Sequence, residues 1–400
     1  MLHMRRVVGR SRRAMVLMGL AALVAGSASL CYLRPQTGPA WLAWPAPRAV
    51  PATGPSWSLF SASFGDPRHG AVGMYSGGLL ATFVTSDGGH TWRRFPMQAA
   101  IATFLDGEHA VAVDLGPSNR FGISDDAGRT WQTAPQPVLF GGPPEALLPG
   151  VFSEPFFLDP ADGWWFGPRP GTGQRTLWRT ADGGRTWSDL APTGVPAADR
   201  RALQPVFLDG LRGALVVAAD GPDVWPALLV THDGGRTWAS AAPAWPPASA
   251  PPGQGLIVSP TLFAHDDRLV LSLDVLVDRS SGPSQQSRRL LATSGDAGST
   301  WGPWTETPLT LPIAAMSFDD TGRLVLADGR LLWSSADAGR TWQSRTVAGL
   351  DGQRSTLLSS RDGMLLVSRL AAPGGAAAPR LLRSLDGGSH WTEVPLPRMR

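Results

Sequence analysis

The eight residues TADGGRTW at Thr180–Trp187 recur, with small changes, at seven places along this 400-residue chain. The copies follow the pattern Ser/Thr-x-Asp-Gly/Ala-Gly-x-Thr/His-Trp, which we call the box. They lie at Thr85–Trp92, Ser124–Trp131, Thr180–Trp187, Thr231–Trp238, Ser294–Trp301, Ser335–Trp342 and Ser384–Trp391. Their Asp residues are 39, 56, 51, 63, 41 and 49 positions apart. A motif that returns at this spacing indicates a repeat architecture, so the boxes decide the fold.

The composition of the box predicts a tight turn between two strands. An Asp carboxylate can accept hydrogen bonds from the backbone amides of its own turn. The Gly that follows two positions later can adopt a positive φ, and the Trp is expected to begin the next strand and to bury its ring. We therefore assign structural roles to Asp87, Asp126, Asp182, Asp233, Asp296, Asp337 and Asp386, and to Trp92, Trp131, Trp187, Trp238, Trp301, Trp342 and Trp391.

Each box lies in a longer repeat with four short strands. A Phe-x-Asp turn precedes the first four boxes, at Phe64–Gly70, Phe104–Ala110, Phe157–Gly163 and Phe207–Gly213, and weaker copies precede the rest. Four strands in a meander at this period form a propeller blade. We predict an all-β fold, a seven-bladed β-propeller of four-stranded antiparallel blades over residues 57–397. We expect no substantial helix after residue 34, and a last blade that joins the first mainly by packing.

The repeated box resembles the BNR/Asp-box superfamily of sialidase-like propellers, over nearly all of the chain beyond residue 56. That superfamily includes sialidases, xyloglucanases, sortilin-type receptors and photosystem II assembly factors. The joint pattern of Phe-x-Asp turn and box looks most like the photosystem II stability and assembly factor family, whose members are non-enzymatic seven-bladed propellers on the extracytoplasmic side of a membrane. The chain departs from the pattern by an Ala in three boxes and by His390 in place of Thr.

The N-terminus predicts export. Five Arg precede an almost unbroken apolar and small-residue run from Ala14 to Leu33, the layout of a secretory signal or an uncleaved signal anchor. Residues 1–33 are therefore a signal peptide or transmembrane anchor, and the Pro- and Ala-rich residues 34–56 a tether. We expect the propeller outside the cytoplasm, membrane-anchored, secreted or periplasmic. Cys31, the single cysteine, excludes an intrachain disulfide and a cysteine-cluster metal site.

The charge distribution argues against a nucleic-acid partner. All 35 basic residues are Arg, and six of them lie in residues 1–34, which contain no acid. The rest of the chain has 29 Arg against 32 Asp and Glu, a net charge of −3. An acidic body has no general affinity for phosphate backbones.

The residue types for a known catalytic site are incomplete. A site that resembles the known sialidases needs a Tyr nucleophile with a Glu partner, but Tyr32 lies in the leader and Tyr75 in the first blade. A glycosidase that uses two carboxylates remains an alternative, with Asp159 and Asp209 as candidates, although each recurs at the same place in other blades. No catalytic residue, metal ligand or cofactor site is assigned.

A partner is expected on the propeller face opposite the boxes. That face is built from loops between second and third strands, and such variable loops on a rigid scaffold commonly bind ligands. Arg and Trp are favoured at binding hot spots. The candidate residues are Arg120, Arg169, Arg175, Trp225, Arg330 and Arg380; Arg279, Arg288, Arg289 and Trp245 belong to the same regions. We predict a monomeric, non-catalytic scaffold that binds a protein partner, such as a membrane complex. The alternative is a sialidase-like or other glycoside hydrolase that acts on extracellular glycans.

Overall fold

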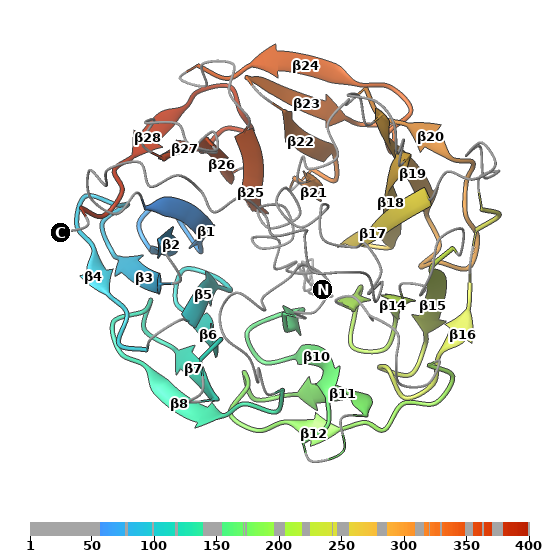
Figure 1. The fold of residues 1–400 in the computed structure, drawn as a ribbon, viewed down its shortest axis with the longest axis horizontal. Helices are drawn as coiled ribbons and strands as arrows, with labels where there is room; N and C mark the ends of the chain where they lie inside the picture. The colour runs from blue at the N-terminus through green and yellow to red at the C-terminus, as the bar shows by residue number, and fades with distance from the viewer. Residues whose placement is uncertain are drawn as a thin grey trace, which may run out of the picture. The chain divides into compact units, whose positions relative to one another are not determined.

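A computed structural model describes the part of the chain from residue 57 to 398, with gaps. The described residues are 57–76, 79–97, 100–116, 119–138, 154–170, 172, 174–195, 205–217, 225–241, 243–245, 256–277, 286–308, 316–319, 321–328, 330–348, 355–361, 364–369 and 379–398. At 60, 256–259, 275–277, 286–288, 328, 355–361 and 368–369 only the backbone is described. These residues form seven four-stranded antiparallel sheets and no helix, which confirms the predicted seven-bladed β-propeller (Figure 1).

The blades belong to two compact units, and unit 1 holds blades 3, 4 and 5. Blade 3 consists of β9 (Phe156–Phe157), β10 (Gly163–Pro168), β11 (Arg175–Thr180) and β12 (Ser188–Asp189). Blade 4 consists of β13 (Val206–Phe207), β14 (Gly213–Val217), β15 (Ala227–Thr231) and β16 (Ala239–Ser240). Blade 5 consists of β17 (Leu256–His265), β18 (Arg268–Val277), β19 (Gln286–Ser294) and β20 (Thr305–Glu306).

Unit 2 holds blades 1, 2, 6 and 7. Blade 1 consists of β1 (Ser58–Phe64), β2 (Gly70–Ser76), β3 (Leu79–Thr85) and β4 (Arg93–Arg94), and blade 2 of β5 (Ala100–Phe104), β6 (Ala110–Asp114), β7 (Arg120–Ser124) and β8 (Gln132–Pro135). Blade 6 consists of β21 (Met316–Phe318), β22 (Leu324–Asp328), β23 (Leu331–Ser335) and β24 (Gln343–Thr346). Blade 7 consists of β25 (Ser355–Arg361), β26 (Met364–Arg369), β27 (Arg380–Ser384) and β28 (Thr392–Val394).

Each blade has two chemically different ends. The box joins the third strand to the fourth, and the Phe-x-Asp turn joins the first to the second, so both lie at one end, the box end. In blade 3 the amide of Gly183 in the box donates to the carbonyl of Ala161 in the turn at 2.9 Å. Equivalent bonds link Gly88 to Arg68, Ala127 to Glu108, Gly234 to Leu211 and Ala297 to Asp267. The opposite end, which carries the loop between second and third strands, is the loop end.

The Phe and Gly of the Phe-x-Asp…Gly repeat are explained by one close contact. The Gly that begins the second strand pairs directly with the Phe that ends the first, as Gly163 does with Phe157. A Cβ atom built on Gly163 would lie 2.8 Å from the Phe157 ring, and one on Gly213 would lie 2.7 Å from the Phe207 ring. In blades 3 and 4 a larger residue would therefore displace the buried ring, whereas blade 2 has Ala110 opposite Phe104.

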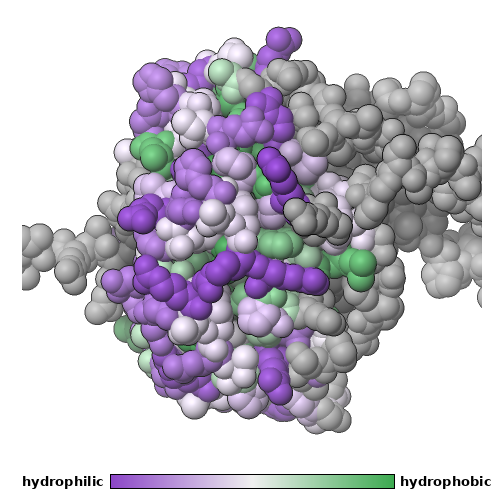
Figure 2. Space-filling view, turned by 90° about the vertical axis from the view of Figure 1, so that its left-hand side faces the viewer, coloured by the Kyte–Doolittle hydropathy of each residue, from purple (hydrophilic) through white to green (hydrophobic). Residues whose placement is uncertain are grey.

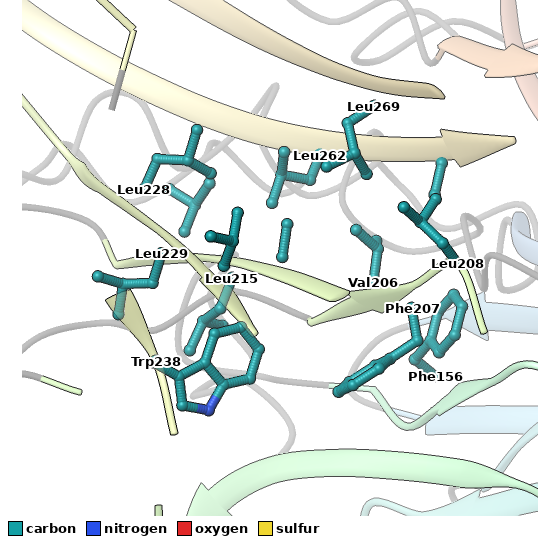
Figure 3. Packing of buried hydrophobic residues seen from close by; sticks show 14 of the residues in the cluster. Phe156, Val206, Phe207, Leu208, Leu215, Leu228, Leu229, Trp238, Leu262 and Leu269 are labelled. Carbon is teal, nitrogen blue, oxygen red and sulfur yellow. The ribbon is translucent and has the colours of Figure 1, made fainter. Parts of the chain in front are cut away.

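The core of unit 1 lies between its three blades. Phe156 and Val206 from first strands meet Leu262 and Leu269 of blade 5 (Figure 3). Trp164, which is fully buried, stacks on Phe207 with ring centroids 3.8 Å apart and planes 11° apart. Burial of each such large side chain contributes ~1.5–3 kcal/mol. Inter-blade packing is therefore a main source of stability in this unit.

In unit 2 the last blade packs directly on the first. Leu59, Phe64 and Met74 of blade 1 share one apolar cluster with Leu366 and Leu381 of blade 7. Among the described strands, every strand of blade 7 comes from the C-terminal segment and every strand of blade 1 from the N-terminal one, so none of them is exchanged. This confirms the prediction that packing joins these two blades.

The position of the box Trp differs from the prediction. The box Trp does not begin the fourth strand, because that strand starts one residue later in six blades and four residues later in blade 5. Trp238 is buried and the other six are only half-buried, since the indole still belongs to the turn.

The leader and tether, residues 1–56, lie outside the described residues. Among those described, no helix is long and apolar enough to cross a membrane.

Candidate functional site

The box carboxylates are fully used by their own turns. Asp182 Oδ1 accepts hydrogen bonds from the Thr186 amide at 2.9 Å and the Thr180 hydroxyl at 2.8 Å, and Oδ2 accepts from the Thr186 hydroxyl at 2.6 Å. Partial burial works to raise the pKa of Asp182, and the Thr186 and Thr180 bonds outweigh it and lower the pKa. The same carboxylate bonds recur in the other six boxes.

The three boxes with Ala show what the turn requires. Ala127, Ala297 and Ala338 have φ values of 59°, 57° and 61°, in the small left-handed region open to residues with a Cβ. The next position is always Gly, and in the box of blade 3 Gly184 has a φ of 91°. Such a φ is beyond the range of Ala. The three Ala residues therefore stand where the backbone of the turn tolerates a Cβ atom.

The two carboxylates weighed as a catalytic pair are also held in turns. Asp159 Oδ1 accepts the amides of Ala161 and Asp162 at 2.9 and 2.8 Å. Asp209 accepts the amides of Leu211 and Arg212 at 2.8 and 2.7 Å, and Arg212 Nε as well. Both lie at the box end of their blades. These hydrogen bonds support a structural role for Asp159 and Asp209, which their recurrence in other blades also indicates.

The candidate Arg residues are partly paired within the chain. Arg169 donates to Asp189 at 2.6 Å and Arg380 to Glu393 at 2.5 Å. Arg120, Arg175 and Arg380 are the first residues of third strands rather than loop residues, and only Arg169 and Arg330 lie in loops. Arg120 and Arg330 are exposed.

Arg289 corrects the loop assignment most clearly. It lies inside β19, directly opposite Asp274 of β18. Its Nε and Nη2 donate to the two carboxylate oxygens of Asp274 at 2.6 and 2.8 Å, and its side chain is 7% exposed. A buried bidentate pair of this kind is a structural element, because removal of one partner leaves an uncompensated charge.

Trp225, which precedes β15 at the loop end of blade 4, takes part in an aromatic stack. Its ring is parallel to that of Trp245, with centroids 5.5 Å apart and planes 1° apart. Trp245 in turn stacks on Trp304, at 5.9 Å and 25°. Trp304 Nε1 donates to the Ala244 carbonyl at 2.7 Å. The three rings, from blades 4 and 5, are all half-buried, so each keeps part of its surface in contact with solvent.

Glu154 is a functional candidate that the sequence analysis did not single out. It precedes β9 at the loop end of blade 3 and is 8% exposed. Its Oε1 atom is buried without a hydrogen-bond partner, and burial raises the pKa of Glu154 from 4.5 to about 8. An alignment of the repeats could have found it. Three residues before the Phe of the corresponding turn, five of the other six blades have Ser61, Ile101, Gln204, Pro260 and Ala315, and the turn of blade 7 has no Phe.

The surface offers little else of chemical note. Among the described residues no group of three or more His, Cys, Asp or Glu could hold a metal ion. The side of the chain in Figure 2 is mainly hydrophilic where it is coloured, with separate hydrophobic spots. The exposed large hydrophobic residues of the described part are Tyr75, Leu79, Leu211 and Leu385. The half-buried aromatic stack, which also packs against the core of unit 1, and Glu154, with its unpartnered oxygen, are therefore the candidates for ligand contacts.

One curated relative matches part of the chain in sequence. A xyloglucanase of a Paenibacillus species is 31% identical over 147 residues, which are 32% of this chain and 14% of that protein. The match thus covers only a small part of the length of the relative. No protein-family model matches the chain.

One solved structure agrees with the fold at a TM-score above 0.5, and two others are similar at lower scores. The β-propeller domain of the trilobed protease from Pyrococcus furiosus, described as having an open velcro topology, gives a TM-score of 0.52 at 8% identity, over 86% of this chain and 97% of that one. The GH74 enzyme of Niastella koreensis gives 0.29 at 13% identity, over 84% and 78%. The GH93 α-L-arabinofuranosidase of Fusarium graminearum gives 0.42 at 13%, over 72% and 92%. At 8% identity the likeness to the Pyrococcus furiosus domain concerns the fold alone.

Proposed function

We propose that this propeller recognises a glycan, xyloglucan or a similar neutral polysaccharide, at the loop end of blades 3 to 5. The observation that carries the proposal is the 31% identity over 147 residues to a xyloglucanase. The half-buried stack of Trp225, Trp245 and Trp304 supports it, since ligand sites combine aromatic surfaces with a few polar groups. Whether bound glycan is also hydrolysed is decided by the same experiment.

A protein partner is the second candidate, and exposed Arg120 and Arg330 favour it. It follows from the Asp-box pattern and its resemblance to photosystem II assembly factors, which suggests an exported scaffold that binds through the loop end. Arg169 pairs with Asp189 and Arg380 pairs with Glu393, so fewer Arg side chains are available to a protein partner than the sequence implied. We therefore rank it below the glycan.

The test is calorimetric titration of the protein with xyloglucan oligosaccharides, with released reducing sugar measured in the same samples. Trp225→Ala and Trp304→Ala should each weaken binding about tenfold if each ring contributes ~1.4 kcal/mol. Leu211→Ala, an exposed apolar residue at the box end, is the matched control and should bind as the unchanged protein does. Absence of oligosaccharide binding, together with capture of a protein that is lost in Arg120→Ala and Arg330→Ala, would reverse the ranking.

A further inference from the structure

Glu154 is a polar group without a structural partner. Among the described residues it is the one carboxylic acid with a buried oxygen, Oε1, that has no hydrogen-bond partner. The other buried acids have partners: Asp114 accepts the Gly116 amide, and Asp319 accepts the Thr321 hydroxyl and the Arg323 guanidinium. A buried oxygen without a partner costs ~1–3 kcal/mol, so this one requires an explanation.

The surroundings of Glu154 make a structural role difficult to find. It lies two residues before Phe156, and the alternation of an extended chain places both side chains on the same side. Phe156 belongs to the apolar core that blades 3, 4 and 5 share (Figure 3). An apolar residue would serve this position better if packing were its whole purpose.

The position of Glu154 is compatible with a ligand site. The first strand runs toward the box end, so the residue before β9 lies at the loop end of blade 3. Trp225 and Trp245 lie at the loop end of blade 4 in the same unit. Glu154 as a whole residue is 8% exposed while its Oε1 atom is buried, so a hydroxyl group that binds this oxygen has to enter beside the exposed part of the residue. The corresponding residues of the other blades are not acidic, so blade 3 differs from the repeat at Glu154. Such a difference is expected where a ligand binds to one part of a repeated scaffold.

We infer that Glu154 is a ligand-binding residue, whose carboxylic acid group exchanges hydrogen bonds with a hydroxyl group of a neutral sugar at the loop end of blade 3. This inference rests on the proposed function and names one polar contact of that site. A carboxylic acid can donate through its O–H and accept through its carbonyl oxygen, so it matches a hydroxyl, which does both. A neutral ligand fits because it requires no buried charge.

The experiment compares Glu154→Leu and Glu154→Gln with the unchanged protein by titration with a xyloglucan oligosaccharide. Glu154→Leu should weaken binding about tenfold, because a sugar hydroxyl loses its partner, and should melt at the same or a higher temperature. Glu154→Gln, which still donates and accepts, should bind within about threefold. Ser61→Ala, at the equivalent position of blade 1, is the control and should change neither property.

A second measurement keeps the inference testable if Glu154→Leu does not fold. The infrared difference spectrum on oligosaccharide binding should show a shifted carbonyl band of a protonated carboxyl group, which is absent in Glu154→Gln. Equal affinity of Glu154→Leu and the unchanged protein, or binding without that shift, overturns the inference and leaves the proposed function intact. If the unchanged protein binds no oligosaccharide while it is folded, the proposed function fails and this inference with it.

Discussion

The chain should lose stability as the pH rises from about 5 to about 8, because of Glu154. Burial raises the pKa of this carboxyl group in the folded chain from 4.5 to about 8. Between these values the folded state keeps a proton that the unfolded state has released, so the free energy of unfolding falls as the pH rises. The contribution of the neutral acid is intact below pH 4.5 and is lost as the pH passes about 8. At ~1.4 kcal/mol per unit, the total reaches roughly 3–5 kcal/mol.

Urea unfolding followed by Trp fluorescence measures this effect, at about pH 5, 6, 7 and 8. The comparison is with Glu154→Gln, which has nearly the same shape and does not titrate. The two proteins should have similar stability near pH 5, and the unchanged protein should become the less stable of the two as the pH rises. Glu108→Gln is the control, because Glu108 is exposed, and its pH profile should follow that of the unchanged protein.

Parallel pH profiles for the unchanged protein and Glu154→Gln would refute this reasoning. They would mean that the carboxyl group meets water or a charged partner in solution, so that its ionisation is free of the cost of burial. The reasoning would be refuted more strongly if the unchanged protein became more stable relative to Glu154→Gln as the pH rises. A difference of that sign requires that the pKa of the Glu154 carboxyl group is lowered in the folded chain.

Three further predictions concern the boxes and the junction of the first and last blades. Asp182→Ala should lower the free energy of unfolding by ~1–3 kcal/mol, measured by urea titration, because turn amides lose their acceptor. Hydrogen bonds from Thr130, first from its hydroxyl and then from its amide, lower the pKa of Asp126 to about 2. Its contribution is present above pH 3.8 and is lost as the pH falls toward 2, so thermal melts should show a drop there that Thr130→Val reduces. Arg383→Ala should cost ~1–2 kcal/mol at the junction, because Arg383 donates to the Pro67 carbonyl at 2.6 Å and lies over the Phe64 ring at 5.4 Å.

The sequence predicted the turns well because their interactions are local. The carboxylate of Asp182, the hydroxyl groups that bind it and the Gly that permits the turn lie within seven residues, so their spacing is visible in the chain. Seven copies of the same local structure then required seven blades. The Phe-x-Asp turn was predicted for the same reason.

The site residues were harder to predict because their partners are distant in sequence. Arg169 is neutralised by Asp189, 20 residues later in the fourth strand of its own blade. Arg289 meets Asp274 only because the register of β18 and β19 places them opposite each other. The stack of Trp225 on Trp245 and Trp304 joins segments of two blades. Residue type alone indicated Arg and Trp, whereas strand register and inter-blade packing decided which remain open to a ligand.

Recurrence and asymmetry separate the structural residues from the functional candidates in this fold. A residue that recurs in every blade, such as the box Asp, performs a task that every blade has, and its hydrogen bonds are complete within its turn. A ligand touches only part of a propeller, so its contacts must come from positions where one blade differs from the rest. Glu154 is such a position, and its unpartnered oxygen is a cost to the fold that the turns do not share. Replacement of a box Asp should therefore lower stability and leave glycan affinity unchanged, whereas replacement of Glu154 by Leu should preserve stability and lower affinity. Opposite results for either residue would show that recurrence does not separate the two classes in this chain.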